Sequence, residues 1–510
     1  MVKTPDVEVA DPATGTHAGD AVPGRGGFFG HPRGLATLFF TEFWERFSYY
    51  GMRALLTLFM TASAVKGGLG FTTERAGAIY GLYTAFVYLL ALPGGWLADR
   101  LLGQRRAVFY GGCIIAAGHF SMAIPSESTF YLGLVLIVIG TGLLKPNVSA
   151  MVGDLYPEGG ARRDAGFSIF YMGINLGAFV APLVCGPLGE QVNWHLGFAC
   201  AGLGMVLGLV QYSLGGKYLG RIGIDPNAGT DPAAQASAQK VLAGAVVAIL
   251  LAVALVWAGV VTIPVEKLAG ATGIVILGIA CLYFGFQFAA GGLDSTERKK
   301  MLVILVLFLF SALFWSGFEQ AGSSLTLFAR DITNRNIFGR LLPVSVLQSV
   351  NPLFIILFAP VFAWLWLRLG RRDPSAPAKF SFGLIFLGLG FGVLMWASML
   401  SLGPNGQVIK VSPLWLVVTY LCHTFGELCL SPVGLSTVTK LAPHRKVSQL
   451  MGIWFMSLAL GNLLAGLIGG QFESFPLPQI FGAVFATTAG AGVILALLAR
   501  PIRRLMGGVH

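Results

Sequence analysis

Residues Thr41–Arg53 read TEFWERFSYYGMR, a segment that places two acidic and two basic residues in an otherwise apolar helix. At about 3.6 residues per turn, its charged and tyrosine side chains fall within one arc, and most of its other aromatic side chains lie on the opposite side. The chain of 510 residues is 55% hydrophobic and only 11% charged, far outside the composition of a soluble globular protein. We therefore expect this helix to lie inside a membrane protein, with its polar arc facing protein or water.

Apolar runs of about 20 residues, long enough to cross a hydrocarbon core of about 30 Å, recur along most of the chain after Gly34. The alternating pattern of a transmembrane barrel is absent. The sequence predicts an all-α polytopic membrane protein with fourteen transmembrane helices, at residues 35–63, 76–99, 107–124, 130–151, 165–188, 196–217, 241–263, 270–292, 301–328, 343–367, 380–402, 413–438, 447–471 and 479–499.

The connecting segments orient these spans. With the N-terminus in the cytoplasm, the cytoplasmic segments hold 24 of the 34 Lys and Arg residues, the outer segments hold seven, and Arg46, Arg53 and Lys145 lie within spans. The positive-inside rule thus predicts a multi-pass protein of the cell (inner) membrane with both termini in the cytoplasm. Residues 1–34, rich in Gly, Pro and Asp, lack the pattern of a signal peptide and are expected to form a disordered cytoplasmic tail.

Several classes of function receive no support from the sequence. The basic residues form no patch with interleaved aromatics, so nucleic acid is not an expected partner. The six cysteines lack CxxC spacing and are interpreted as packing residues, so no metal or cofactor is expected. The chain contains no GxxxxGK[ST] loop for a nucleotide and no HExxH or GxSxG pattern of an enzyme.

The spans predicted at 241–263 and 270–292 carry no charged residue, whereas the sets of six spans on either side do. We interpret this pair as an insertion. The predicted division is a tail (1–34), an N-terminal six-helix bundle (35–220), a linker with two extra helices (221–300), a C-terminal six-helix bundle (301–504) and a short tail (505–510). Two bundles of six helices are the layout of the major facilitator superfamily. The loop Gly94–Arg106, GGWLADRLLGQRR, also resembles the GxxxDRxGRR-like loop of that superfamily.

Seven charged residues lie inside the predicted spans, away from the span ends: Glu42, Glu45, Arg46, Arg53, Lys145, Glu319 and Glu427. An unpaired charge at the bilayer centre costs at least about 2.5 kcal/mol, so we expect ion pairs. Arg53 and Glu319 lie at matching depths on equivalent spans of the two halves, and so do Lys145 and Glu427. We predict the pairs Arg53–Glu319 and Lys145–Glu427 across a central cavity, made and broken as the halves rock. The alternative is that these pairs only fix helix packing.

Three motifs resemble those of the proton-dependent oligopeptide transporter (POT/PTR2) family. EFWERFSYYGMR is similar to the family motif ExxERFxYY, and GTGLLKPNVS (Gly140–Ser149) resembles GxGxxKPN. FYMGINLGAF (Phe170–Phe179) resembles FYxxINxGS, with Ala178 in place of the usual Ser. The segments FWSGFEQAGSSL, QSVNPLF, GELCLSPVGLS and GIWFMSLALGN follow in the order that the family shows. Two extra helices between the halves are also found in bacterial members.

The resemblance implies a bacterial peptide transporter, which imports di- and tripeptides with protons by alternating access, is not an enzyme and functions as a monomer among membrane lipids. By similarity, the peptide carboxylate is bound by Arg46 and Lys145, and its free amine by Asn175, Asn351 and Glu427. The side-chain pockets are expected to be lined by Tyr50, Tyr83, Trp315 and Trp454. Proton coupling is expected to involve Glu42, Glu45 and Glu319, the last by releasing Arg53 when protonated.

Other functions remain open at this stage. Plant relatives carry nitrate or other solutes, and a non-transporting peptide sensor would use a similar cavity. The ExxER residues and Lys145 favour peptide transport. Some single residues also have a structural alternative. Trp315 and Trp454 could be aromatic residues of the core, and Asn175 and Asn351 could form hydrogen bonds between helices. His423 is expected to be a packing residue.

Overall fold

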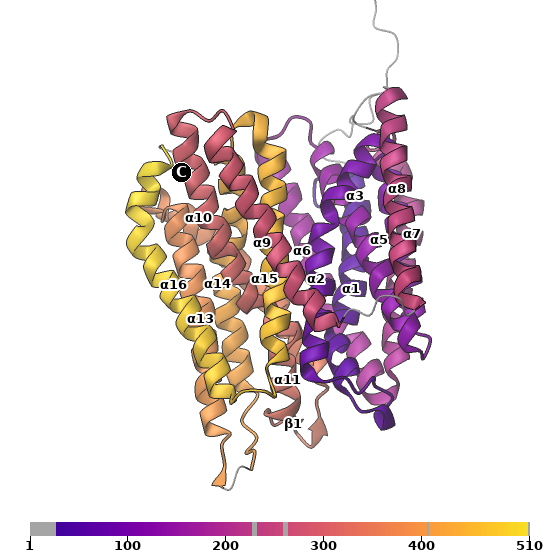
Figure 1. Ribbon diagram of the computed structural model, residues 1–510, viewed down its shortest axis with the longest axis vertical. Helices are drawn as coiled ribbons and strands as arrows, with labels where there is room; N and C mark the ends of the chain where they lie inside the picture. The colour runs from indigo at the N-terminus through magenta and orange to yellow at the C-terminus, as the bar shows by residue number, and fades with distance from the viewer. Residues whose placement is uncertain (1–26, 227–231, 259–263, 405–406, 508–510) are drawn as a thin grey trace, which may run out of the picture.

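The computed structural model describes residues 27–226, 232–258, 264–404 and 407–507 and is almost entirely helical (Figure 1). The N-terminal bundle consists of α1 (Arg33–Thr61), α2 (Thr73–Leu89) continued by α3 (Ala91–Leu97), α4 (Gln104–Met122), α5 (Glu127–Asp154), α6 (Gly160–Pro187) and α7 (Trp194–Gly215). The C-terminal bundle consists of α10 (Ser295–Phe318) continued by α11 (Ser324–Asp331), α12 (Val350–Leu369), α13 (Ala376–Leu400), α14 (Leu414–Leu441), α15 (Val447–Gly470) and α16 (Leu477–Leu505). Helices α8 (Pro232–Trp257) and α9 (Val265–Ala290) lie between them in the sequence.

Short elements join or end these helices. They are η1 (Ala64–Lys66), η2 (Ala98–Leu102), η3 (Leu188–Val192), η4 (Gly216–Leu219), η5 (Glu319–Gly322), η6 (Ser345–Ser349), η7 (Gly370–Arg372) and η9 (His444–Lys446). The strands β1 (Asn336–Ile337) and β2 (Arg340–Leu341) form an antiparallel hairpin. We call the face of the molecule that holds the C-terminus the upper face, and the opposite face, which holds α11 and the hairpin, the lower face (Figure 1).

The predicted all-α fold with fourteen spanning helices is confirmed, with two spans interrupted. Span two is interrupted at Leu90 between α2 and α3; just beyond it, Pro93 supplies no backbone N–H and Gly94 and Gly95 weaken the helix. Span nine is interrupted at η5, between α10 and α11. Among the described residues, eleven helical segments are long and apolar enough to cross a membrane. Helix α1 is not among them because it carries four charged residues inside the span.

The end of the predicted disordered tail is ordered, which corrects that boundary. Residues 1–26 of the predicted tail lie outside the described residues. Phe28 and His31 exchange backbone hydrogen bonds of 3.0 and 2.9 Å, and the Phe28 ring packs 5.4 Å from the ring of Phe39. Helix α1 begins at Arg33, and the Phe28–Phe39 contact holds the preceding segment against this helix.

Packing follows the two bundles. Helix α1 packs against α6 and α7, and α4 packs against α5 and α7, whereas α13 packs against α14 and α16 in the second bundle. The bundles meet where α2 lies along α15 and where α6 contacts η6 and α12, and α9 packs against both α2 and α15. The extra helix α9 therefore covers one side of the joint between the bundles (Figure 1).

The joint between α2 and α15 depends on glycines. A Cβ added at Gly466 would lie 2.5 Å from the Cα of Gly81 and would overlap the carbonyl oxygen of Gly77. Only residues without a side chain permit two helix backbones to approach this closely.

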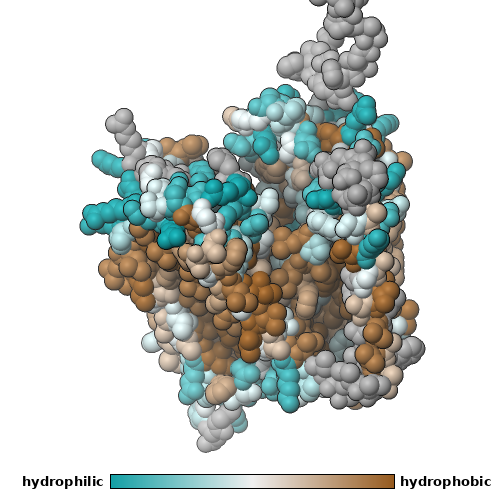
Figure 2. Space-filling view, turned by 45° about the horizontal axis from the view of Figure 1, so that its top comes forward, coloured by the Kyte–Doolittle hydropathy of each residue, from teal (hydrophilic) through white to brown (hydrophobic). Residues whose placement is uncertain are grey.

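The outer surface has the pattern of a membrane protein. Figure 2 shows a broad hydrophobic band around the middle of the molecule, with hydrophilic residues gathered toward its two ends. This band and the apolar helices identify a multi-pass membrane protein. The same view shows a hollow between the two bundles at the upper face.

Candidate functional site

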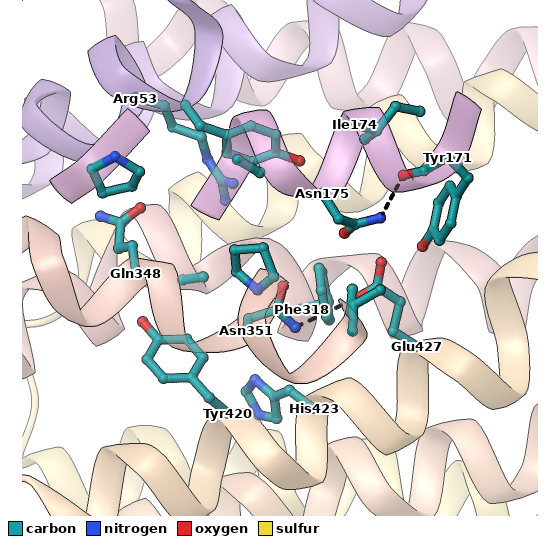
Figure 3. A pocket seen from close by; sticks show the side chains of 16 residues that line it. Arg53, Tyr171, Ile174, Asn175, Phe318, Gln348, Asn351, Tyr420, His423 and Glu427 are labelled. Carbon is teal, nitrogen blue, oxygen red and sulfur yellow. Dashed lines mark hydrogen bonds between the residues drawn. The ribbon is translucent and has the colours of Figure 1, made fainter. Parts of the chain in front are cut away.

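A cavity lies between the two bundles and encloses about 710 Å³ of space not filled by atoms. Its walls come from α1 and α6 on one side, and from the α10–η5 junction, η6, α12 and α14 on the other (Figure 3). The lining residues are Tyr50, Arg53, Tyr171, Ile174, Asn175, Ala178, Pro182, Phe318, Ala321, Gln348, Asn351, Pro352, Ile355, Tyr420, His423 and Glu427.

The three residues expected to receive an amine all line this cavity. Asn351 Nδ2 donates to Glu427 Oε2 at 3.4 Å and to the hydroxyl of Thr424 at 3.0 Å. Asn175 faces them from α6 and donates its Nδ2 to the backbone oxygen of Tyr171 at 3.0 Å (Figure 3). The long bond to Asn351 leaves most of the acceptor capacity of the Glu427 carboxylate available. This wall of the cavity is suited to a cationic group.

The predicted pair Arg53–Glu319 is formed in the structure. Arg53 Nη2 lies 2.7 Å from Glu319 Oε2, and both side chains are buried. Tyr80 completes the group, because its hydroxyl accepts from Arg53 Nε at 2.9 Å and donates to the backbone oxygen of Glu319 at 3.0 Å. Arg53 belongs to α1 and Glu319 begins η5, so this ion pair joins the two bundles at the interrupted span. Its role as a gate remains a prediction.

The ExxER residues form a second charged group, on α1 alone. Arg46 Nε lies 3.1 Å from Glu42 Oε1 and also forms an ion pair with Glu45. All three side chains are buried, and Glu42 Oε2, Glu45 Oε1 and Arg46 Nη2 have no hydrogen-bond partner. Buried polar atoms are normally paired, so this group retains acceptors for a proton and a donor for an anion.

The bundles are joined from the middle of the molecule down to the lower face. Below Arg53, the Thr57 hydroxyl donates to the backbone oxygen of Gly322 at 2.6 Å, and Arg330 donates to the Thr61 hydroxyl at 2.6 Å. The hollow in Figure 2 lies at the opposite, upper end. The structure is therefore closed toward the lower face and open toward the upper face.

A family model described as the POT family matches residues 105–484, which is more than half of the chain. The chain belongs to the POT family. It is 44% identical over 501 residues to the peptide transporter YePEPT of Yersinia enterocolitica, which covers 96% of this chain and 98% of that protein. It is 38% identical over 491 residues to a di-/tripeptide transporter of Lactococcus lactis, with coverage of 95% and 98%. The crystal structure of a mutant of peptide transporter POT in complex with alafosfalin superposes with a TM-score of 0.87, at 45% identity and coverage of 96% and 99%.

The second ion pair predicted for the POT family site differs from the first. The predicted pair Lys145–Glu427 is not formed in this structure; because it is predicted to be made and broken as the halves rock, it stays a prediction. Lys145 Nζ lies 4.3 Å from the centroid of the Tyr88 ring within the N-terminal bundle, and Glu427 instead contacts Asn351. Each residue instead contacts a side chain of its own bundle, Lys145 of α5 with Tyr88 of α2 and Glu427 of α14 with Asn351 of α12.

Three aromatic residues predicted to line side-chain pockets are packed in the cores of the bundles and are absent from the cavity lining. Tyr83 stacks on Tyr49 with centroids 6.2 Å apart, and its hydroxyl is buried without a partner. Trp315 packs edge-on against Phe318, and Trp454 lies against Gly434. In this conformation the two tryptophans are aromatic residues of the core, because neighbouring side chains fill the space around them.

Several lining residues were not predicted as part of the POT family site. Tyr171 lies one turn before Asn175 on α6, and Tyr420 and His423 precede Glu427 by seven and four residues on α14. His423, expected only to pack, does so against Phe391 at 5.0 Å between ring centroids but also borders the cavity. Helical spacing from the predicted residues would have found these side chains. Gln348, in η6, begins the segment QSVNPLF and lies three residues before Asn351, but no role was predicted for it.

Proposed function

We propose that this chain is a proton-coupled symporter that imports di- and tripeptides by alternating access, without enzymatic chemistry. The observation that carries the proposal is a cavity between two bundles whose C-terminal wall holds Glu427 and Asn351, while the N-terminal bundle buries basic groups. That polarity suits a zwitterion. Two relatives are named as peptide and di-/tripeptide transporters, which supports this class of cargo.

In this proposal the peptide lies across the cavity. Its free amine binds Glu427, with Asn351 and Asn175 as amide partners, and its carboxylate is drawn toward Arg46 and Lys145. Tyr50 borders the space between these ends. Repacking as the bundles rock would bring Tyr83, Trp315 and Trp454 to the peptide side chains.

Proton coupling uses two charged groups, the ExxER residues on α1 and the Arg53–Glu319 pair. Glu42 and Glu45 each retain a carboxylate oxygen without a partner, which is a place for a proton. Protonation of Glu319 removes the negative charge that holds Arg53 and so favours separation of the bundles at the lower face. A proton and a peptide would thus act on the same conformational equilibrium.

The positive-inside rule supports an upper face in the cytoplasm. With that orientation the described conformation is inward-open, both termini lie in the cytoplasm, and the protein resides in the inner membrane in contact with lipid. We propose that it functions as a monomer, because each chain contains both walls of the cavity. The division at residues 35–220, 221–300 and 301–504 is kept as the proposed domain organisation.

The test separates proton coupling from peptide exchange. In Glu45→Gln and Glu319→Gln, uptake driven by a proton gradient should be lost while peptide counterflow, which needs no net proton movement, is retained. Glu158→Gln, at a carboxylate that is 52% exposed, is the matched control and should behave as wild type. Intact driven uptake in both variants would contradict the assigned coupling. Peptide binding by wild type without any counterflow would favour a sensor.

A further inference from the structure

Glu190, at the lower end of α6, is bound to the opposite bundle. It lies in η3, and its carboxylate accepts three hydrogen bonds from the start of η6. The backbone N–H of Val344 donates to Oε2 at 2.7 Å, and the N–H and the hydroxyl of Ser345 donate to Oε1 at 2.8 and 2.5 Å. Val344 and Ser345 are buried. We call these three bonds the Glu190 latch.

The Glu190 latch supplies hydrogen-bond acceptors that η6 cannot supply for itself. Backbone N–H groups at the start of a helical segment have no acceptor within it. Here a side chain from the N-terminal bundle satisfies two such groups in the C-terminal bundle. Hydrogen bonds to an ionised carboxylate are roughly twice as strong as neutral ones, so the bundles cannot part on this side without losing substantial binding energy.

Neighbouring contacts show that the two segments fit closely. The Ser349 hydroxyl donates to the backbone oxygen of Phe179 at 2.8 Å. Gly186 packs directly against Ser345, and an added Cβ there would overlap the Ser345 hydroxyl. This α6–η6 contact involves neither α1 nor η5, which carry the Arg53–Glu319 pair. Two separate sets of polar contacts therefore close the lower face, one between α1 and the η5–α11 segment and one between the end of α6 and η6.

We propose that Glu190 is a gate residue of the transport cycle, which holds the lower face closed through η6 and must release it before peptide enters. The inference rests on the alternating-access function proposed above and adds a residue that never touches the peptide. The latch is also reversible. Glu190 borders a surface depression lined by Lys66, Asn193 and Trp194, so water has access to its carboxylate when η6 moves away.

Three variants of the full-length protein test the latch. Glu190→Gln removes the charge that all three donors share. Gly186→Ala leaves Glu190 intact but forces Ser345 away, and Ser345→Ala removes only the hydroxyl bond, so a smaller effect is expected. Glu158→Gln is the control, an exposed glutamate at the upper end of the same bundle.

Hydrogen–deuterium exchange in lipid nanodiscs gives a readout at both faces without requiring a cargo. In Glu190→Gln and Gly186→Ala, amides within 336–350 should exchange on the order of tenfold faster, the factor expected for losing one bond to a charged group. Segments at the upper face, 150–165 and 440–452, should exchange more slowly as that face closes. Glu158→Gln should match wild type at both faces.

Faster exchange at 336–350 with slower exchange at the upper face supports the gate. Faster exchange confined to 336–350, or no change at all, would overturn it, because the latch would then only cap η6 locally. If the stronger variants fold poorly, Ser345→Ala still tests the gate: slightly faster exchange at 336–350 together with slightly slower exchange at the upper face supports it. Since no peptide or proton gradient is used, this result is independent of whether the cargo proposed above is correct.

Discussion

Replacing Glu319 by Gln is expected to open the lower face. In the structure the Glu319 carboxylate lies 2.7 Å from Arg53 Nη2, and each residue is only 6% exposed. The substitution keeps the shape of the side chain and removes its charge. Arg53 then keeps one neutral partner, the Tyr80 hydroxyl at 2.9 Å from its Nε.

The size of the effect follows from the burial of this pair. Removing one partner of a buried ion pair costs about 3–5 kcal/mol. Because Tyr80 remains bonded to Arg53 and the new amide side chain retains a carbonyl oxygen, we expect the lower end, about 3 kcal/mol, for the closed state. At about 1.4 kcal/mol per tenfold change, the ratio of open to closed lower faces rises roughly 100-fold. If the open lower face is populated at about 1% in the wild type, it would then be about as abundant as the closed one in the variant.

Spin labels at Val65 and Phe338 report this change. Both residues are fully exposed at the lower face and belong to opposite bundles. In a background without reactive native cysteines, pulsed electron resonance should show a longer distance gaining population in Glu319→Gln. Glu158→Gln should leave the distribution unchanged. An unchanged distribution in Glu319→Gln would refute the assignment of Arg53–Glu319 as a gate.

Three further outcomes follow from the geometry. Glu427→Gln should weaken dipeptide binding about 10- to 100-fold by calorimetry, since a bond to a charged group is lost, while an N-acetylated dipeptide, which has no ammonium group, should bind equally to both forms. If Lys145 and Glu427 pair in the other conformation, Lys145→Glu with Glu427→Lys should recover part of the counterflow that each single variant loses, and no recovery would exclude the pair. Gly466→Ala should lower the unfolding temperature through an overpacked joint worth about 1–3 kcal/mol, whereas Gly278→Ala on α9, with no atom within 4 Å of its added Cβ, should not.

The arrangement of helices was predictable because lipid permits few alternatives. Long apolar runs must become helices, and the basic connecting segments constrain their direction. The Arg53–Glu319 pair followed from the same reasoning, since two opposite charges at equal depth on equivalent helices must find partners inside the protein. These inferences use only the depth of a residue in the membrane, which follows from the number of residues between it and the end of its helix.

Features that depend on conformation were not predictable. Lys145 and Glu427 also match in depth, yet in this conformation each contacts a side chain of its own bundle instead of the other residue. The Glu190 latch depends on the exact height of η6 against α6, which no sequence pattern records. The break at Glu319 was not predicted, although the segment Glu319–Ser324, EQAGSS, interrupts the apolar run of α10 with polar and small residues.

Uptake of labelled dialanine into liposomes that contain the purified protein tests the central claim most directly. An inward proton gradient is imposed and then collapsed with an ionophore. Peptide–proton symport predicts accumulation of dialanine above its equilibrium level and loss of that accumulation when the gradient is removed. Absence of uptake, or accumulation that ignores the gradient, would contradict the account.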